Sequence, residues 1–369
     1  MLECKKEPVI IDYDIYNVFG KGIESTWQAV LNQKTNYREC NRFTREHYRK
    51  KFAAIAPGTE NIPTKDIPEL FLNYLQPSAL KMPESTEIFL ASTVGIIDEW
   101  NNPEHRCTSN LLLEHVLNVF QKKRGRVVSA ACASVNTSFS ILNHLIRSGR
   151  VDSAIVVGID YVSEFVFSGF SVLRAMAESA PSPYDSQRDG LLLGDSAGLI
   201  AVSSREFANE HHKKIFGKIL GTGLTCDAYH ITAPMPNGEM LAQAIQNAMD
   251  SANITPEEIG AVIGHGTGTV YNDAMEINAL HHFYGNEGVP LLSVKANAGH
   301  TLAGAGLLQI SIALKILETG IIPGQTGLSH PAPGAENYVS KFPKELKKKK
   351  IMCMNSGFGG VNAVVILGL

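Results

Sequence analysis

Short apolar runs alternate with helical runs along most of this sequence, and this alternation most limits the folds open to it. Residues 126–131 (RVVSAA) predict a buried strand. Residues 134–147 (SVNTSFSILNHLIR) predict a helix that stops before Gly149, and residues 154–159 (AIVVGI) predict the next strand. Parallel strands need such a helical crossover, so this βαβ unit predicts a parallel sheet covered by helices.

The same alternation returns in the second part of the chain. Strands are predicted over 214–221, 261–264, 291–295, 351–355 and 362–367, and helices over 240–252 and 304–318, with a new helix start at 255–258. The most polar mid-chain stretch, residues 205–214, separates the two parts. We therefore expect an α/β protein of two halves, residues 1–210 and 211–369. The order of elements suggests that the two halves arose by duplication, but their sequences show no clear identity.

Composition and charge exclude several classes of protein. The 369 residues are 44% hydrophobic and 19% charged, as in globular proteins with a sizeable core. A net charge of −3 gives no global attraction to nucleic acid or to an anionic membrane. The longest apolar runs look too short for the roughly 20 residues of a membrane span, and the start, MLECKKEPVI, lacks the apolar stretch of a signal peptide. The six cysteines form no C-x-x-C pair, so we expect a cytoplasmic protein without a metal site.

Cys132 stands at the predicted strand-to-helix junction, in the stretch SAACASVNTS. The start of a helix offers unpaired N–H groups and the positive end of the helix dipole, which favour a thiolate. Small neighbours leave room for a ligand at this turn. A buried structural cysteine fits the local sequence equally well, so the stretch alone does not decide between the two.

Three further loops follow predicted strands, where α/β folds place their ligands. His265 lies in GHGTGT, between glycines that allow close approach of a ligand. His300 ends KANAGH, ahead of a run of small residues. Phe358 is the one large side chain in NSGFGGVN, which is either a simple hairpin turn or a movable gate. One cysteine and two histidines suit nucleophilic thioester chemistry, but their spacing does not say that the loops meet.

Taken in order, the motifs AACAS, HGTGT, K-x-x-x-GH and SGFGGVN resemble those of the β-ketoacyl-acyl carrier protein synthases, in their elongating Cys-His-His branch. The resemblance is strong after about residue 120 and weak before it. It implies the thiolase fold, in which two similar α/β halves form five layers. It also implies an acyltransferase of fatty acid or polyketide/polyene biosynthesis, which joins an acyl unit to a malonyl unit with loss of CO2.

The resemblance implies a role for each motif residue. Cys132 would take the acyl group from acyl carrier protein, and His265 and His300 would bond the malonyl thioester as CO2 leaves. Lys295, paired with Glu276, would position the site, and the backbone N–H groups of Cys132 and Phe358 would form an oxyanion hole. The implied substrate contacts are Thr232, Thr267 and Thr269 to the phosphopantetheine arm, Phe170 in the acyl pocket, Phe358 as the gate and Arg174 toward the carrier protein. No cofactor is expected, because phosphopantetheine arrives on the carrier.

Some alternatives stay open. A thiolase would need a second catalytic cysteine in the C-terminal turn, but that turn reads SGFGG and Cys353 lies upstream. Initiating synthases use Cys-His-Asn, whereas His300 follows glycine as in the elongating branch. An inactive chain-length factor typically lacks the nucleophile. The chain is therefore expected to form a homodimer, or a heterodimer as the active partner of a chain-length factor.

The part before Cys132 departs from the family. It is shorter than usual, and residues 59–83, which in the family help to cap the site, match poorly. The basic cluster Arg42, Arg45, Arg49, Lys50 and Lys51 either docks an acidic carrier protein or is a solvated face.

Overall fold

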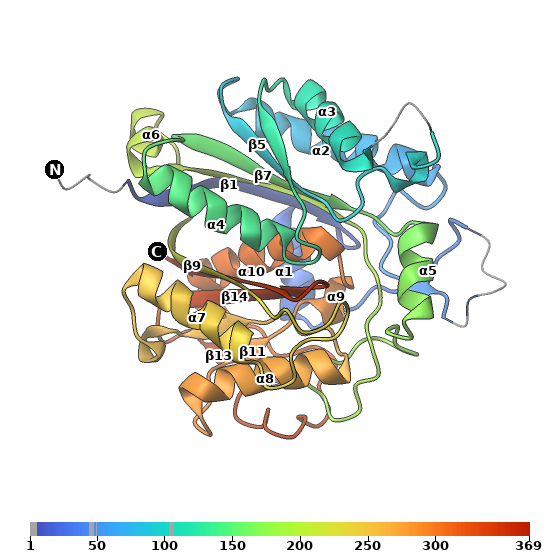
Figure 1. The fold of residues 1–369 in the computed structure, drawn as a ribbon, viewed down its shortest axis with the longest axis vertical. Helices are drawn as coiled ribbons and strands as arrows, with labels where there is room; N and C mark the ends of the chain where they lie inside the picture. Colours follow the sequence, from blue (N-terminus) through green and yellow to red (C-terminus); the bar gives the residue numbers. More distant parts are fainter. Residues whose placement is uncertain (1–5, 44–47, 49, 103–106) are drawn as a thin grey trace.

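The structure is a computed structural model of all 369 residues, described here except for residues 1–5, 44–47, 49 and 103–106 (Figure 1). Its first half contains five main strands in the order β6-β5-β7-β8-β1. They are β1 (Pro8–Asn17), β5 (Glu87–Ala91), β6 (Gly125–Val128), β7 (Ser153–Asp160) and β8 (Ser196–Ser204). β5 is parallel to β6 and β7, whereas β8 is antiparallel to β7 and to β1.

The second half repeats this arrangement strand for strand, in the order β11-β10-β14-β15-β9. Its strands are β9 (Gly217–Cys226), β10 (Ala261–Ile263), β11 (Leu291–Leu292), β14 (Lys350–Gly357) and β15 (Val361–Gly368). β10 is parallel to β11 and β14, and β15 is antiparallel to β14 and β9. A short antiparallel contact between β1 and β9 joins the two halves into one continuous sheet.

Helices complete the layers. The helices α4 (Ser134–Arg147) and α10 (Ala305–Thr319) lie between the two halves of the sheet and contact strands of both (Figure 1). The outer layers are α2 (Ile67–Leu80) and α3 (Thr108–Phe120) over the first half, and α7 (Glu239–Ala252) and α8 (Val270–Tyr284) over the second (Figure 1). The smaller helices are α1 (Ile23–Leu31), α5 (Glu164–Val172), α6 (Arg205–Glu210) and α9 (Lys295–Ala298). The result is the predicted α/β arrangement of five layers.

Helix α10 is apolar on nearly every side because it is packed on every side. Residues Leu302–Thr319 are long and apolar enough to cross a membrane, which the sequence analysis had not noticed. However, 83% of this segment is buried inside the protein. A helix that is hydrophobic all round is expected at the centre of a large core, and α10 occupies that position between the sheet halves.

The predicted elements nearest the functional motifs are confirmed, with two shifts at their ends. Helix α4 has the predicted bounds, and β14 and β15 form the predicted hairpin. Strand β6 ends at Val128, three residues early, because Ala131 adopts a left-handed φ of 48° and turns the chain. Strand β11 is also shorter than predicted, since Lys295 begins the short helix α9 instead.

Candidate active site

Three loops from distant parts of the sequence meet at one point between the halves. Cys132 lies in the turn between β6 and α4, His265 follows β10, and His300 follows α9. The potential ligand atoms of these three side chains all lie within 4.8 Å of one another. Each residue is at most 5% exposed. The structure thus brings together the three residues that the sequence singled out for chemistry.

The Cys132 thiol is buried in the turn that precedes helix α4. Its helix begins two residues later, at Ser134. Burial raises the pKa of Cys132 to about 12, although Lys295 and the backbone N–H groups of Cys132 and Phe358 favour the thiolate. The expectation of a thiolate is therefore wrong for the resting site, because loss of hydration outweighs the attraction of these groups. The two N–H groups converge on the sulfur. A thioester oxygen bound at the same place could accept hydrogen bonds from both.

His265 is fixed from both sides. Its backbone N–H donates to Glu276 Oε2 at 2.7 Å, and its Nδ1 lies 3.0 Å from Asn355 Oδ1 and 3.2 Å from Lys295 Nζ. Lys295 Nζ also donates to the His265 carbonyl oxygen. Burial and the nearby Lys295 charge hold the pKa of His265 well below its usual value, so the imidazole is neutral.

His300 has a defined hydrogen-bonding role at its inner nitrogen. Leu302 N donates to His300 Nδ1 at 3.1 Å, so the neutral ring carries its hydrogen on Nε2. Burial, Lys295 and His265 all lower the pKa of His300 well below its usual value. His300 can therefore donate a hydrogen bond without carrying a positive charge. With its Nδ1 occupied and its Nε2 protonated, it has no free lone pair for a metal ion, although the donor set of Cys132 and two histidines could otherwise suit one.

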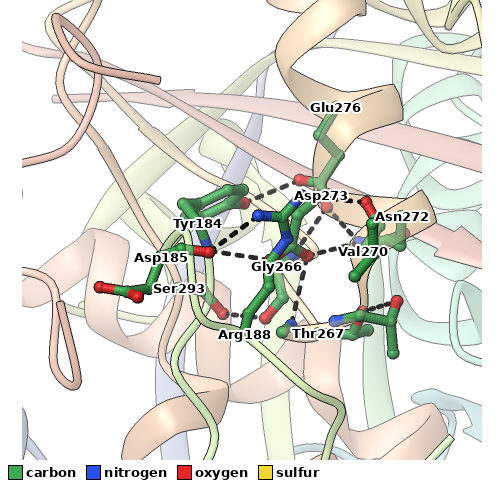
Figure 2. Close-up of polar contacts among 12 residues, drawn as sticks. Tyr184, Asp185, Arg188, Gly266, Thr267, Val270, Asn272, Asp273, Glu276 and Ser293 are labelled. Carbon is green, nitrogen blue, oxygen red and sulfur yellow. Dashed lines mark hydrogen bonds and ion pairs between the residues drawn. The ribbon is translucent and has the colours of Figure 1, made fainter. Parts of the chain in front are cut away.

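Glu276 anchors the His265 loop with a saturated carboxylate. Four donors surround it: His265 N and Gly266 N at 2.7 Å, Asn272 Nδ2 at 2.6 Å and Tyr184 Oη at 2.9 Å. Figure 2 shows Glu276 with Tyr184, Gly266 and Asn272. No ion pair joins Glu276 to Lys295 in the described part of the chain, which corrects the direct pairing expected from the sequence. The four donors occupy the Glu276 oxygens, and Lys295 Nζ bonds His265 instead. Glu276 and Lys295 still interact through their charges. Burial lowers the pKa of Lys295, and the negative charge of Glu276 opposes this effect.

The sequence analysis missed several residues of this network. Asp273 accepts from Tyr184 N at 2.8 Å and from Gly268 N at 3.2 Å. Arg188 lies beside Asp273 (Figure 2). Tyr184 and Arg188 belong to the stretch SPYDSQRDG, and nothing in its spacing ties it to His265. Asn355 opens the NSGFGGVN turn and shows no separate signal in the sequence.

A cavity of about 390 Å³ opens onto the three central side chains. Its lining includes every expected substrate-contacting residue: Thr232, Thr267, Thr269, Phe170, Phe358 and Arg174. Lys295 and Glu276 are buried and do not line it. Thr267 and Thr269 share a 2.8 Å hydrogen bond between their hydroxyls. Four apolar residues that line the cavity, Leu173, Ile231, Val270 and Tyr271, are also exposed to solvent.

Phe358 lies across this cavity at the turn between β14 and β15. Its ring stacks on Phe170 with centroids 5.6 Å apart, and the Phe170 ring meets the His300 ring at 6.2 Å. Phe358 is 39% exposed, and Gly359 and Gly360, both with left-handed φ, follow it. A partly exposed ring followed by two glycines can move at lower cost than a ring enclosed in the core.

The expected basic docking patch is only partly described. Arg42 is buried in an ion pair with Asp195 and is therefore unavailable to a partner. Lys50 pairs with Glu178, and Lys51 is exposed. Arg45 and Arg49 lie outside the described residues.

Comparisons with known proteins agree with this site. The N-terminal domain of the β-ketoacyl synthases matches residues 124–208, and the C-terminal domain of the same family matches residues 216–329. The 3-oxoacyl-[acyl-carrier-protein] synthase 2 of Vibrio harveyi is 26% identical over 408 residues, covering 98% of each chain. The protein of that name from Staphylococcus aureus is 33% identical over 246 residues, or 64% of this chain and 61% of the relative.

Solved structures agree on the fold. The ishigamide ketosynthase/chain length factor structure matches with a TM-score of 0.89 and 26% identity, over 99% of both chains. A β-ketoacyl synthase from Burkholderia phymatum STM815 matches with a TM-score of 0.86 and 21% identity, over 98% of this chain and 99% of that one. The thiolase fold is confirmed, and the chain belongs to the β-ketoacyl synthase family, whose members are acyltransferases that form carbon–carbon bonds.

Proposed function

We propose that this protein is a β-ketoacyl-acyl carrier protein synthase of fatty acid or polyketide/polyene biosynthesis. It would join an acyl group held on Cys132 to a malonyl group on acyl carrier protein, with loss of CO2. The observation that carries the proposal is the convergence of one cysteine and two neutral histidines, within 4.8 Å, on a single cavity.

The first step loads the nucleophile. The Cys132 sulfur attacks the thioester carbonyl of acyl-phosphopantetheine, and the carrier thiol leaves with the proton that Cys132 gives up. Negative charge develops on the carbonyl oxygen during this attack. The N–H groups of Cys132 and Phe358 converge on the sulfur and would hold that oxygen. Because the resting thiol is protonated, its proton must be lost as the bond forms rather than beforehand.

The second step makes the carbon nucleophile. As the malonyl C–C bond breaks, its electron pair moves toward the thioester carbonyl and CO2 departs, leaving an enolate. His300 would donate Nε2–H to the enolate oxygen, and His265 would approach it from the neighbouring loop. Neutral donors stabilise this charge without a metal. The enolate carbon then attacks the acyl-Cys132 carbonyl, and the Cys132 sulfur leaves.

The cavity would hold the substrate arm. Thr232, Thr267 and Thr269 would bond the phosphopantetheine amides, and Arg174 would face the carrier protein at the opening. Phe170 would line the acyl pocket, with Phe358 as the gate beside it. Acyl carrier protein is thus the proposed partner, the protein itself needs no further cofactor, and we propose that it acts in the cytoplasm.

A non-decarboxylating thiolase is less well supported. Its second catalytic cysteine would have to reach the cavity, but Cys353 is fully buried within β14 and does not line it. The active subunit of a heterodimer is the stronger alternative, since the similar ishigamide structure contains a ketosynthase with a chain length factor.

The test is acylation of Cys132 by a panel of acyl carrier proteins, followed by intact-protein mass spectrometry. Wild-type protein should gain one acyl group and then form a β-ketoacyl product from malonyl carrier protein. Cys132→Ala should lose both events, while Cys353→Ala should retain them. An acyl-enzyme formed by Cys132→Ala at the wild-type yield would overturn the proposal.

A further inference from the structure

Asp160 is a buried carboxylate that the proposed chemistry does not use. It is the last residue of β7 and is 1% exposed. It does not line the cavity, so it is not placed to touch a substrate. Its charge nevertheless reaches the site, since it raises the pKa of Cys132.

The Asp160 oxygens collect donors from two other segments. Ser92 Oγ donates at 2.9 Å, Thr93 Oγ1 at 3.0 Å, and Thr93 N at 3.1 and 3.2 Å to the two oxygens. These two residues follow β5. From the second half of the protein, Ala303 N donates to Asp160 Oδ2 at 2.8 Å. The carboxylate therefore connects the first half directly to the short turn that leads into α10.

That turn supplies the hydrogen-bond donor to Nδ1 of His300. Leu302 precedes Ala303 and has a left-handed φ of 53°, which is strained for leucine. In this conformation Leu302 N–H reaches His300 Nδ1. The backbone of His300 is held separately, by Leu192 O and Gly194 N. The orientation and tautomer of the ring therefore depend on the turn that Asp160 holds.

Stability alone does not explain a charge at this position. Burial raises the pKa of Asp160 to about 6, despite all of its donors. A folded-state pKa above the usual value means that the folded state binds the proton more tightly than the unfolded chain. The unfolding free energy therefore falls as pH rises through the window between about 3.8 and 6, and the ionised carboxylate costs stability at neutral pH. One interaction does stabilise the ionised carboxylate. Asp160 lies at the amino end of α10, where the helix dipole attracts an anion.

We propose that Asp160 is a positioning residue for His300. It holds the turn 302–304 so that Leu302 N–H keeps the hydrogen of the His300 ring on Nε2, facing the reacting oxygen. This inference rests on the proposed function, because it assigns Asp160 to the decarboxylation step. It predicts that Asp160 matters little for loading Cys132, which uses backbone N–H groups elsewhere.

The test compares loading of Cys132 and decarboxylation in the variant Asp160→Asn. Asparagine has the same size as aspartate, but its NH2 group cannot accept the hydrogen bonds that Ser92, Thr93 and Ala303 donate. We expect release of labelled CO2 from malonyl carrier protein to fall about 10- to 100-fold, somewhat less than for loss of a donor itself. Acylation of Cys132 should stay within about threefold of wild type. In addition, ¹⁵N NMR of histidine-labelled protein should show that His300 no longer keeps its hydrogen on Nε2 alone.

Matched variants separate this role from folding. Asp14→Asn removes another partly buried carboxylate, one bonded by Tyr74 and Ile15 in the first half, and should change neither step. Thr93→Val removes one donor but keeps the carboxylate, and it should lower CO2 release by a smaller factor. If Asp160→Asn fails to fold, Thr93→Val provides the same comparison.

The inference would be overturned by an unchanged His300 tautomer, by unchanged CO2 release, or by an equal loss of acylation in Asp160→Asn. Its failure differs from failure of the proposed function. In the latter case, wild-type protein would itself neither acylate Cys132 nor release CO2.

Discussion

At the residue scale, burial favours the uncharged form of the three central groups of the site. The Cys132 thiol and both imidazoles are neutral at rest, and Lys295 supplies positive charge behind them. The same loss of hydration makes a hydrogen bond to a developing negative charge stronger than it would be in water. The arrangement therefore favours a reaction in which charge appears only as bonds change.

The two histidines should serve decarboxylation more than loading. His265→Ala and His300→Ala should each lower CO2 release by about 100- to 1000-fold, because each removes a group near the enolate oxygen. Both variants should still acquire an acyl group, since backbone N–H groups serve that step. Intact-protein mass and labelled CO2 release measure the two steps side by side. A variant that lost acylation but kept decarboxylation would reverse the role of that histidine.

The raised pKa of Cys132 predicts slow alkylation at neutral pH. Only the thiolate reacts, and with a pKa of about 12 its fraction grows about tenfold for each pH unit from 7 to 9. The rate of modification by iodoacetamide should follow this slope, with the exposed Cys107 as an internal reference. Peptide mass spectrometry gives both rates. A rate at Cys132 that is already constant at pH 7 would show that the thiolate is the resting form.

At the element scale, the loops work because glycines let neighbouring segments approach closely. A Cβ atom on Gly264 would lie 2.0 Å from Tyr184 Oη and 2.6 Å from Glu276 Oε2. Gly264 directly follows β10 and precedes His265, so the chain leaving this strand places His265 in the network that surrounds Glu276. The position of His265 thus depends on Glu276, which lies 11 residues later in the chain, and on Tyr184, which lies far earlier and bonds Glu276.

Gly264→Ala should therefore damage both stability and chemistry. Overpacking at such a contact costs about 1–3 kcal/mol, and displacement of Tyr184 or Glu276 would move His265. Gly169→Ala is the matched control, because its Cβ would meet nothing within 4 Å in helix α5, where alanine is favoured over glycine by about 0.5–1 kcal/mol. Denaturant unfolding measures both variants. Equal stability of the two would contradict the close packing at Gly264.

At the scale of the whole molecule, the two halves have the same strand order and the same pattern of parallel and antiparallel pairs. The path of the sheet ends at β6 on one side and at β11 on the other. An unpaired strand edge is a template for pairing with another chain. Because β6 leads into the Cys132 turn, a partner at that edge would pair with the strand that precedes Cys132.

We therefore expect a dimer in solution. Light scattering at micromolar concentration should give twice the chain mass of 40.1 kDa. If the protein is the active half of a heterodimer, it should reach that size only when a chain-length factor chain is added. A monomer that carried out the full condensation alone would contradict both forms of this prediction.

The local structure and the central residues of the site could be predicted from the sequence alone. The period of its apolar residues predicted α4 and the hairpin of β14 and β15, because these elements depend on neighbouring residues. The order of the motifs identified the family, and with it Cys132, His265 and His300 as the residues of interest.

How those residues meet, and in what protonation state, depends on the tertiary structure. The donors around Glu276, the turn held by Asp160 and the burial of Arg42 each join segments far apart in the chain. The protonation state of Cys132 also depends on the tertiary structure. Its place at the start of a helix predicted a thiolate, whereas burial raises its pKa and favours the neutral thiol. Hydration and long-range contacts depend on what surrounds a group in space, and a local pattern of residues does not contain that information.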